Sequence, residues 1–131
     1  MITENMIFDR LSKQLTAKHK GLYVTSVYEP VARRLPCVFA YESHVTQRKR
    51  NISLTDFANH RVSTFTVEVY VKKDGGKALL QEITENVKQI FAGLFFILQT
   101  EDSPPNADLS ITRRVLRFSR VIGNGDTITK E

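Results

Sequence analysis

The stretch VSTFTVEVYVKKDGGKALLQEITENVKQIF, from Val62 to Phe91, decides the fold of this chain. Its first half alternates apolar and polar residues, which is the pattern of a β-strand with one buried face. Asp74, Gly75 and Gly76 then predict a turn. The inward residues of the strand are expected to be Phe65, Val67, Val69 and Val71, and the outward residues Thr64, Thr66, Glu68 and Tyr70.

After this turn, apolar residues recur every three or four positions, which indicates an amphipathic helix that packs one side against a core. Charged residues occupy the opposite side, as a surface helix requires. The apolar stripe consists of Leu79, Leu80, Ile83, Val87, Ile90, Phe91 and Leu94, and the charged side of Lys77, Glu82, Glu85 and Lys88.

Two further strands are predicted beyond this helix. FFILQTE, from Phe95 to Glu101, can form one, and LSITRRVLRFSRVI, from Leu109 to Ile122, a longer one, with a loop that contains two prolines between them. The Asn-Gly pair in GNGD is a hairpin signal, because both positions readily take positive φ. TITK, residues 127–130, is therefore expected to return as an edge strand.

The residues before Val62 predict a helix and two more strands. Thr3 followed by Glu4 is a typical helix start, and the apolar spacing that follows predicts a helix from Thr3 to Lys18. LYVTSVY, from Leu22 to Tyr28, is rich in β-branched and aromatic residues and predicts a strand. CVFAYESHV predicts the next strand, with Cys37, Phe39, Tyr41 and Val45 on one face and Glu42 and His44 on the other.

The segment TQRKRNISLTDFANH, Thr46 to His60, has neither a strand period nor a helix period. It carries the basic run Arg48, Lys49 and Arg50. Long segments without regular structure usually bind something or become ordered in an assembly. We therefore expect an arm at about 46–61 that is mobile in the isolated subunit and ordered in an assembly.

The order of these elements predicts one α+β domain over residues 1–131. A mainly antiparallel mixed sheet would carry two helices packed on one face, and its other face would be charged. The length of 131 residues suits one domain with one core. The formal charge of +5 favours acidic partners but is below that of a dedicated nucleic-acid binder.

Few residues in the chain are suited to cofactor or metal chemistry. Cys37 is the only cysteine, and His19, His44 and His60 fall in separate segments, so no zinc site and no cofactor are expected. Cys37 itself is expected to be a buried, inert thiol. The N-terminus resembles no export signal, and the apolar run from Ile90 to Leu98 is too short to cross a bilayer, so a soluble protein made in a reducing cytoplasm is expected.

No enzyme signature is present either. GNGD lacks the spacing to a Lys-Ser or Lys-Thr pair that a phosphate-binding loop needs, and it does not follow the dinucleotide pattern. The arginines around it could still bind nucleic acid. Pleating, however, sends Arg113 and Arg117 to one strand face and Arg114 and Arg120 to the other, so that they form no single patch. Nucleic-acid readers also interleave exposed aromatics, for which only Phe118 is available.

Four segments together resemble a known family. The opening ITEN before a helix, the strand TFTVEVYVKKDGGK that runs into a helix, the loop PPNAD, and the closing ITRRVLRFSRVIGNGDTI are similar to the tail terminator proteins of long-tailed bacteriophages. These proteins are also labelled minor capsid or tail completion proteins. The resemblance covers most of the chain in element order, with residues 33–60 outside it.

The resemblance implies a non-enzymatic virion protein without catalytic residues. Such a subunit would form a hexameric ring at the head-proximal end of the tail, assembled in the host cytoplasm. Its partners would be other copies of itself, the tail tube protein and the head–tail connector protein, and DNA would pass through without specific binding. A connector completion protein is the alternative within this class, and a small nucleic-acid-binding module the alternative outside it.

The arginines of the last strand are the predicted interface residues in this ring. At least one of them is expected to pair with an acidic residue of the neighbouring subunit or ring. The basic set is Arg113, Arg114, Arg117 and Arg120, and the acidic candidates are Glu68, Glu82, Glu85, Glu101 and Asp102.

Overall fold

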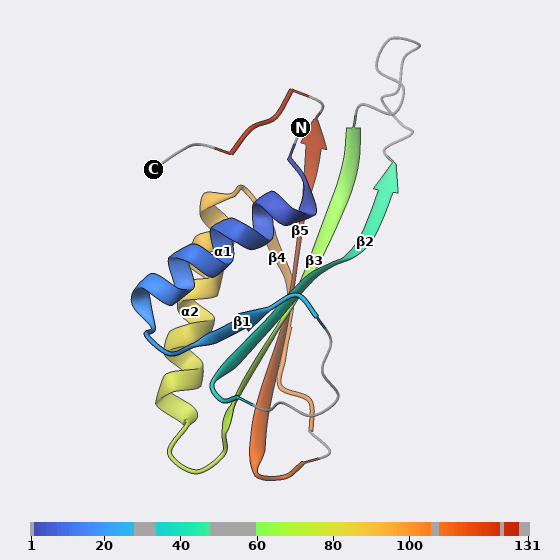
Figure 1. Cartoon of the computed structure of the whole chain (residues 1–131). Helices are drawn as coiled ribbons and strands as arrows, with labels where there is room; N and C mark the ends of the chain where they lie inside the picture. The colour runs from blue at the N-terminus through green and yellow to red at the C-terminus, as the bar shows by residue number, and fades with distance from the viewer. Residues whose placement is uncertain (1, 28–33, 48–59, 106–107, 124, 129–131) are drawn as a thin grey trace.

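The computed structural model describes residues 2–27, 34–47, 60–105, 108–123 and 125–128. Two helices and a five-stranded mixed sheet make up an α+β fold, as predicted (Figure 1). In chain order the elements are α1 (Glu4–Lys18), β1 (Tyr23–Thr25), β2 (Cys37–Gln47), β3 (His60–Lys72), α2 (Lys77–Gly93), β4 (Ile97–Asp102) and β5 (Ile111–Gly123).

The sheet has the strand order β1-β2-β3-β5-β4. Only the pairing of β1 with β2 is parallel, and the other three are antiparallel. The long strands β3 and β5 pair over their whole lengths at the centre. The helix α2 connects β3 to β4, which lies beyond β5, so this connection passes over β5.

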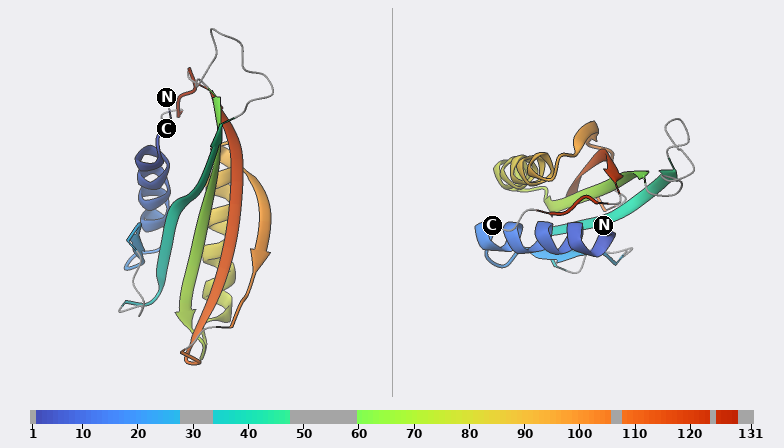
Figure 2. Two further views of the ribbon diagram at one scale, coloured as in Figure 1. Left: turned by 90° about the vertical axis from the view of Figure 1, so that its right-hand side faces the viewer. Right: turned by 90° about the horizontal axis from the view of Figure 1, so that it is seen from above.

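The core lies between one face of the sheet and both helices, as predicted (Figure 2). The inward residues of β3 are all at most 2% exposed, and the apolar stripe of α2 packs against them. Four phenylalanines, Phe65, Phe91, Phe96 and Phe118, form an aromatic cluster at the centre.

The first helix forms where the sequence predicts it. The Thr3 side chain accepts a hydrogen bond from the Met6 N–H at 3.3 Å and caps the first turn. Ile7, Leu11 and Leu15 are buried, because the spacing of four residues places them on one side of the helix.

The turn before α2 requires glycine at one position. A Cβ atom at Gly76 would lie 1.9 Å from the carbonyl oxygen of Lys72, so no larger residue fits without a backbone shift. Gly75 precedes it with a φ of +72°, a conformation that side chains disfavour. This turn lets α2 begin directly after β3 and fold back onto the sheet.

Three of the strand predictions need correction. β1 is only three residues long, because the Thr25 hydroxyl accepts a hydrogen bond from the Val27 N–H and bends the chain. Val38 and Ala40 supply the core side of β2, whereas Cys37 and Phe39 are buried on the opposite face. A register shift between Glu42 and His44 then breaks the alternation, so His44 shares the face of Cys37, and Val45 lies on the other.

The prediction of a returning edge strand at residues 127–130 is also wrong, at the two of these residues that the structure describes. Residues 127 and 128 are not in a strand, and Ile128 packs against the core instead. The chain turns at Gly123, because Asp126 accepts a hydrogen bond from the Gly123 N–H at 2.7 Å. Figure 1 shows the segment after β5 running toward the helix side of the sheet.

The predicted arm at about 46–61 is wrong at its two ends, because Thr46 and Gln47 belong to β2, and His60 and Arg61 belong to β3. Its basic residues, Arg48, Lys49 and Arg50, lie outside the described residues.

Candidate interaction surface

The arginines of β5 lie on two opposite faces of the sheet, as the strand period predicts. Arg113 and Arg117 pair in register with Tyr70 and Thr66, on the face away from the helices, which we call the open face. Arg114 and Arg120 lie on the helix side. Each of these four guanidinium groups has a different environment, so they are considered in turn.

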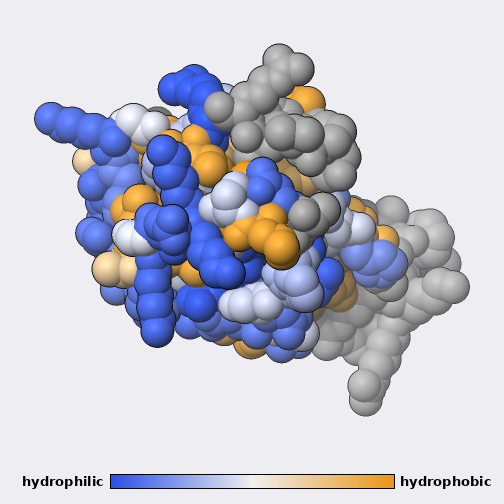
Figure 3. All heavy atoms as spheres, turned by 90° about the horizontal axis from the view of Figure 1, so that it is seen from below, coloured by the Kyte–Doolittle hydropathy of each residue, from blue (hydrophilic) through white to orange (hydrophobic). Residues whose placement is uncertain are grey.

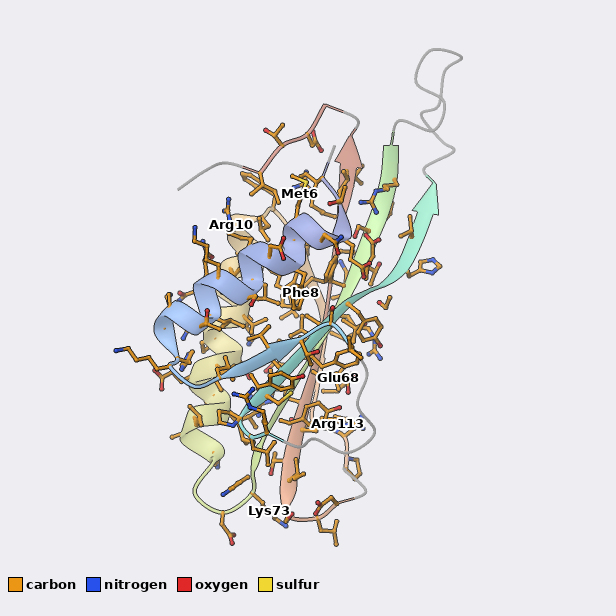
Figure 4. All side chains as sticks on the ribbon, viewed as in Figure 1. Met6, Phe8, Arg10, Glu68, Lys73 and Arg113 are labelled. Atoms are coloured by element: carbon orange, nitrogen blue, oxygen red, sulfur yellow. The ribbon has the colours of Figure 1, made fainter. Side chains whose placement is uncertain are left out.

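Arg113 lies in a groove on the open face. The groove has a volume of about 560 Å³ and is lined by Tyr41, Thr66, Glu68, Asp102, Ser103, Pro104, Arg113, Val115 and Arg117. Within it, Glu68 accepts hydrogen bonds from Arg113 Nη1 at 3.2 Å and from the Tyr70 hydroxyl at 2.8 Å. Figure 4 shows the side chains of Glu68 and Arg113 next to each other.

The outward side of β3 is therefore less exposed than its polar residues predict. Thr66 is 2% exposed, and its hydroxyl donates to Ser43 Oγ at 2.8 Å. Glu68 is 9% exposed, because Tyr70 and Arg113 lie against it. Burial, together with the hydrogen bond to Glu68, raises the pKa of Tyr70 to about 12.

Because the pKa of Tyr70 is raised in the folded chain, the stability of the fold should decrease at high pH. An unfolded tyrosine ionises near 10, whereas folded Tyr70 keeps its proton until about 12, so the free energy of unfolding should fall as the pH rises from 10 to 12. Tyr70→Phe is expected to remove this contribution. Urea unfolding of parent and variant on both sides of pH 10 measures this contribution. If the difference in their free energies of unfolding does not change with pH, the prediction is wrong.

Arg117 is the most exposed of the four arginines. Its side chain is 49% exposed, and its guanidinium contacts Asp102 only at 4.0 Å; the side chain of Asp102 is itself 62% exposed. An ion pair this open contributes about 0–1 kcal/mol to stability. Arg117 and Asp102 are therefore available to a partner at the edge of the groove.

Arg114 belongs to a charge network on the helix side. Its Nη1 donates to Gln81 at 3.0 Å and lies 3.6 Å from Glu101. Lys88 contacts the same Glu101 at 2.6 Å, and this hydrogen bond raises the pKa of the lysine. The network ties α2 to β4 and β5, and it uses Glu101, one of the predicted interface acids, within the subunit.

Arg120 is the least exposed of the four, at 12%. Its two terminal nitrogens donate to the Leu94 carbonyl at 2.8 Å and to Asp126 at 2.9 Å. It thus joins the end of α2 to the segment after β5. Arg120, which the sequence predicts as an interface residue, therefore already donates its hydrogen bonds within its own subunit.

Arg120 and Arg117 form a matched pair for a stability test. Arg120→Ala is expected to lower the free energy of unfolding by about 1–3 kcal/mol, because it removes a charge-assisted hydrogen bond and leaves a carbonyl unpaired. Arg117→Ala is expected to change it by no more than about 0.5 kcal/mol. Denaturant unfolding followed by circular dichroism measures both changes in the free energy of unfolding. Equal changes would contradict the view that Arg120 is bonded within the subunit and Arg117 is not.

The remaining candidates take part in structure or stay exposed. Glu85 pairs with Lys88 at 3.4 Å, and Glu82 lies on the exposed side of α2. His19 lies 2.7 Å from Asn86 and links the two helices. Within the described ranges, no group of three or more His, Cys, Asp or Glu residues could hold a metal ion. No helix in the described part of the chain is long and apolar enough to cross a membrane.

Sequence reasoning missed two groups of polar residues. One joins Glu42 to Arg61 and Ser63 beneath the start of α1. The other is Asp126 with Arg120. Neither group has a signal in the sequence, because its members meet only when the strands pair or the chain turns at Gly123.

The comparison of this chain with solved structures gives a likeness in the fold. No protein-family model and no curated protein matches this chain. One chain of a solved structure, described as the virion of a native gene transfer agent particle, has the same fold with a TM-score of 0.66. The alignment covers 89% of this chain and 91% of that one at 14% identity.

Proposed function

We propose that this chain is a virion structural protein of a tailed, phage-like particle, and specifically a tail terminator. In this role it forms a hexameric ring that caps the tail tube and presents a surface for head attachment. The observation that carries the proposal is the likeness, over nearly the full length of both chains, to a chain from the virion of a gene transfer agent. The motif resemblance to tail terminators supports the same role.

The surfaces of the subunit are suited to assembly. The open face carries a groove with one exposed cation and one exposed anion, Arg117 and Asp102, at its edge. Glu68 in the same groove is bonded to Arg113 and Tyr70, so its carboxylate is already engaged. Such a groove is suited to recognition by a complementary charged surface.

The end of the subunit formed by the β3–α2 turn and the residues before β5 has a different character. Figure 3 shows that hydrophilic side chains cover most of it, with small separate apolar patches. Leu109, 76% exposed, borders a second hollow there of about 480 Å³, together with Lys72 and Lys73. A polar end of this kind is suited to a contact with the ring above or below.

Electron microscopy of tails made with and without the protein tests the role. Overlong tubes in its absence support the terminator, and normal tubes that fail to join heads support a connector completion protein instead. Tight, salt-sensitive binding of the purified protein to short DNA would favour the nucleic-acid module.

Arg117→Glu tests the open-face contact in the same assay. If Arg117 is desolvated against a neighbour, reversing its charge should abolish capping, since removing one partner of a buried interfacial pair costs about 2–5 kcal/mol. The isolated variant should still fold, because Arg117 makes only a 4.0 Å contact within its own subunit. Lys77→Glu, on the exposed side of α2, is the control and should cap tails normally. If Arg117→Glu caps tails as well as this control does, Arg117 is a solvated charge and not part of the contact.

A further inference from the structure

The subunit carries exposed positive charge at one of its two edges. Here α1 packs against β1 and β2, the strands at one side of the sheet, and Figure 2 shows α1 and β4 at opposite edges. Lys18 ends α1, and Lys20 follows two residues later; both are exposed. Within the described ranges neither lysine forms an ion pair. Their charges are therefore open to a partner.

The opposite edge, where α2 lies beside β4, carries exposed negative charge. Glu85 of α2 and Glu101 of β4 both contact Lys88, at 3.4 Å and 2.6 Å, so Glu85 lies on the β4 side of α2. The Glu85 side chain is nevertheless 50% exposed. Glu82, one turn earlier on the helix, is exposed and has no ion pair with any residue that the structure describes.

These opposite charges lie at the same height along the strands. His19, between the two lysines, lies 2.7 Å from Asn86, the residue that follows Glu85. The end of α1 is therefore level with the middle of α2. Successive residues of a helix point about 100° apart, so Asn86 faces α1 while Glu85 faces the other edge.

The upper ends of the two edges are also level with each other. The Glu4 carboxylate at the start of α1 accepts a hydrogen bond from the Glu42 N–H of β2 at 2.7 Å. Glu42 pairs with Phe65 of β3. Phe65 pairs with Phe118 of β5, and Phe118 with Leu98 of β4. The start of α1 and the start of β4 thus lie in one row across the sheet.

Both of these starts expose apolar side chains. Met6 of α1 is 40% exposed, and Leu98 of β4 is 39% exposed. Leu98 lies on the helix side of the sheet, because it pairs with Phe118, which belongs to the core. It therefore faces the layer that contains α1. Phe95, two residues before β4, adds an aromatic side chain that is 75% exposed.

We infer that the α1 edge of one copy of this chain packs against the α2–β4 edge of a second copy. The α1 edge supplies Met6, Lys18 and Lys20, and the α2–β4 edge supplies Leu98, Glu82 and Glu85. A copy rotated about an axis along the strands keeps the heights of its residues, so apolar groups meet apolar groups and lysines meet glutamates. Repeated contacts between two different edges close into a ring. The inference rests on the proposed function only in taking that ring as the assembly.

Cross-linking of cysteine variants of the full chain tests the contact. Met6→Cys and Leu98→Cys are made separately in a Cys37→Ala background and treated with a short bismaleimide, each alone and as a mixture. The reaction is run in concentrated solution and on purified tail tubes. Covalent dimers are expected on denaturing gels from the mixture and not from either variant alone. Dimers from one variant alone, or no mixed dimers in either setting, would overturn the inference.

A second mixture controls for chance collisions between exposed cysteines. Leu109→Cys takes the place of Leu98→Cys, because Leu109 is 76% exposed but lies before β5, at the other end of the subunit. Its mixture with Met6→Cys should give no dimers. A yield equal to that of the first mixture would show that the cross-links report collisions, and it would overturn the inference.

Charge reversal in one partner at a time tests which edges meet. Lys18→Glu/Lys20→Glu in the chain with the cysteine on α1 should lower the yield of mixed dimers about tenfold, because attraction becomes repulsion. Glu82→Lys/Glu85→Lys in the chain with the cysteine on β4 should restore the yield. The same glutamate changes placed in the first chain should not restore it. An undiminished yield, or no restoration, would overturn the inference.

A matched control for the lysine variant is Lys72→Glu/Lys73→Glu. It changes the net charge by the same amount, but it lies at the end formed by the β3–α2 turn. It should leave the yield of mixed dimers unchanged, and circular dichroism checks that every variant is folded. A loss as large as that of Lys18→Glu/Lys20→Glu would show that net charge, and not this contact, sets the yield.

Microscopy of the same tails separates the contact from the proposed function. Capped tails together with mixed dimers support both. Capped tails without mixed dimers overturn the contact and leave the proposed function standing. Mixed dimers from a protein that leaves tail tubes overlong support the contact and overturn the terminator role.

Discussion

Replacement of Phe91 by alanine is expected to lower the free energy of unfolding by about 3–5 kcal/mol. Phe91 is fully buried, and its ring stacks on Phe118 with 4.4 Å between ring centroids. It also meets Phe96 edge to face at 5.2 Å and lies 5.8 Å from Phe65. The substitution therefore removes contacts with β3, with β5 and with the residue before β4 at once, and it leaves a cavity where the surrounding strands can collapse only partly.

Such a loss is a large part of the total stability of a domain, which is about 5–15 kcal/mol. Guanidinium unfolding followed by circular dichroism measures it. Phe95→Ala is the matched control, because Phe95 lies at the end of the same helix but is 75% exposed. It should change the stability by about 0.5 kcal/mol or less. A Phe91→Ala variant as stable as Phe95→Ala would contradict the position of this core.

Glu42→Ala is expected to cost about 3 kcal/mol, the second largest effect, because it removes one partner of a nearly buried ion pair. Glu42 and Arg61 lie 2.7 Å apart, and their side chains are only 12% and 19% exposed. The same carboxylate oxygen accepts a hydrogen bond from Ser63, which is fully buried. Arg61 also donates to the Ile2 carbonyl at 2.8 Å, so the pair holds the start of the chain against β2 and β3.

A double variant tests this explanation more directly than the single one. Glu42→Ala leaves a guanidinium without its counter-charge, whereas Glu42→Ala/Arg61→Ala leaves none. The double variant should therefore lose less stability than the sum of the two single losses, as measured by urea unfolding. Strictly additive losses would show that the two side chains do not act as a pair.

The sequence by itself determined the elements whose residues follow one period. The alternation in β3 predicted its four inward residues, and the stripe in α2 predicted its buried side, because a strand or helix with one buried face repeats its own geometry along the chain. The same period placed the arginines of β5 on two faces. The α+β class followed from the order of these elements.

The tertiary structure alone determined the features that depend on contacts between residues far apart in the chain. The bulge in β2 moved Val45 to the other face, and Asp126 turned the chain where a hairpin was expected. Burial of Glu68 and the bonds of Arg120 likewise need groups from several elements. A local pattern cannot specify these positions, because the strength of each polar contact depends on which partner the folded chain brings within hydrogen-bond distance.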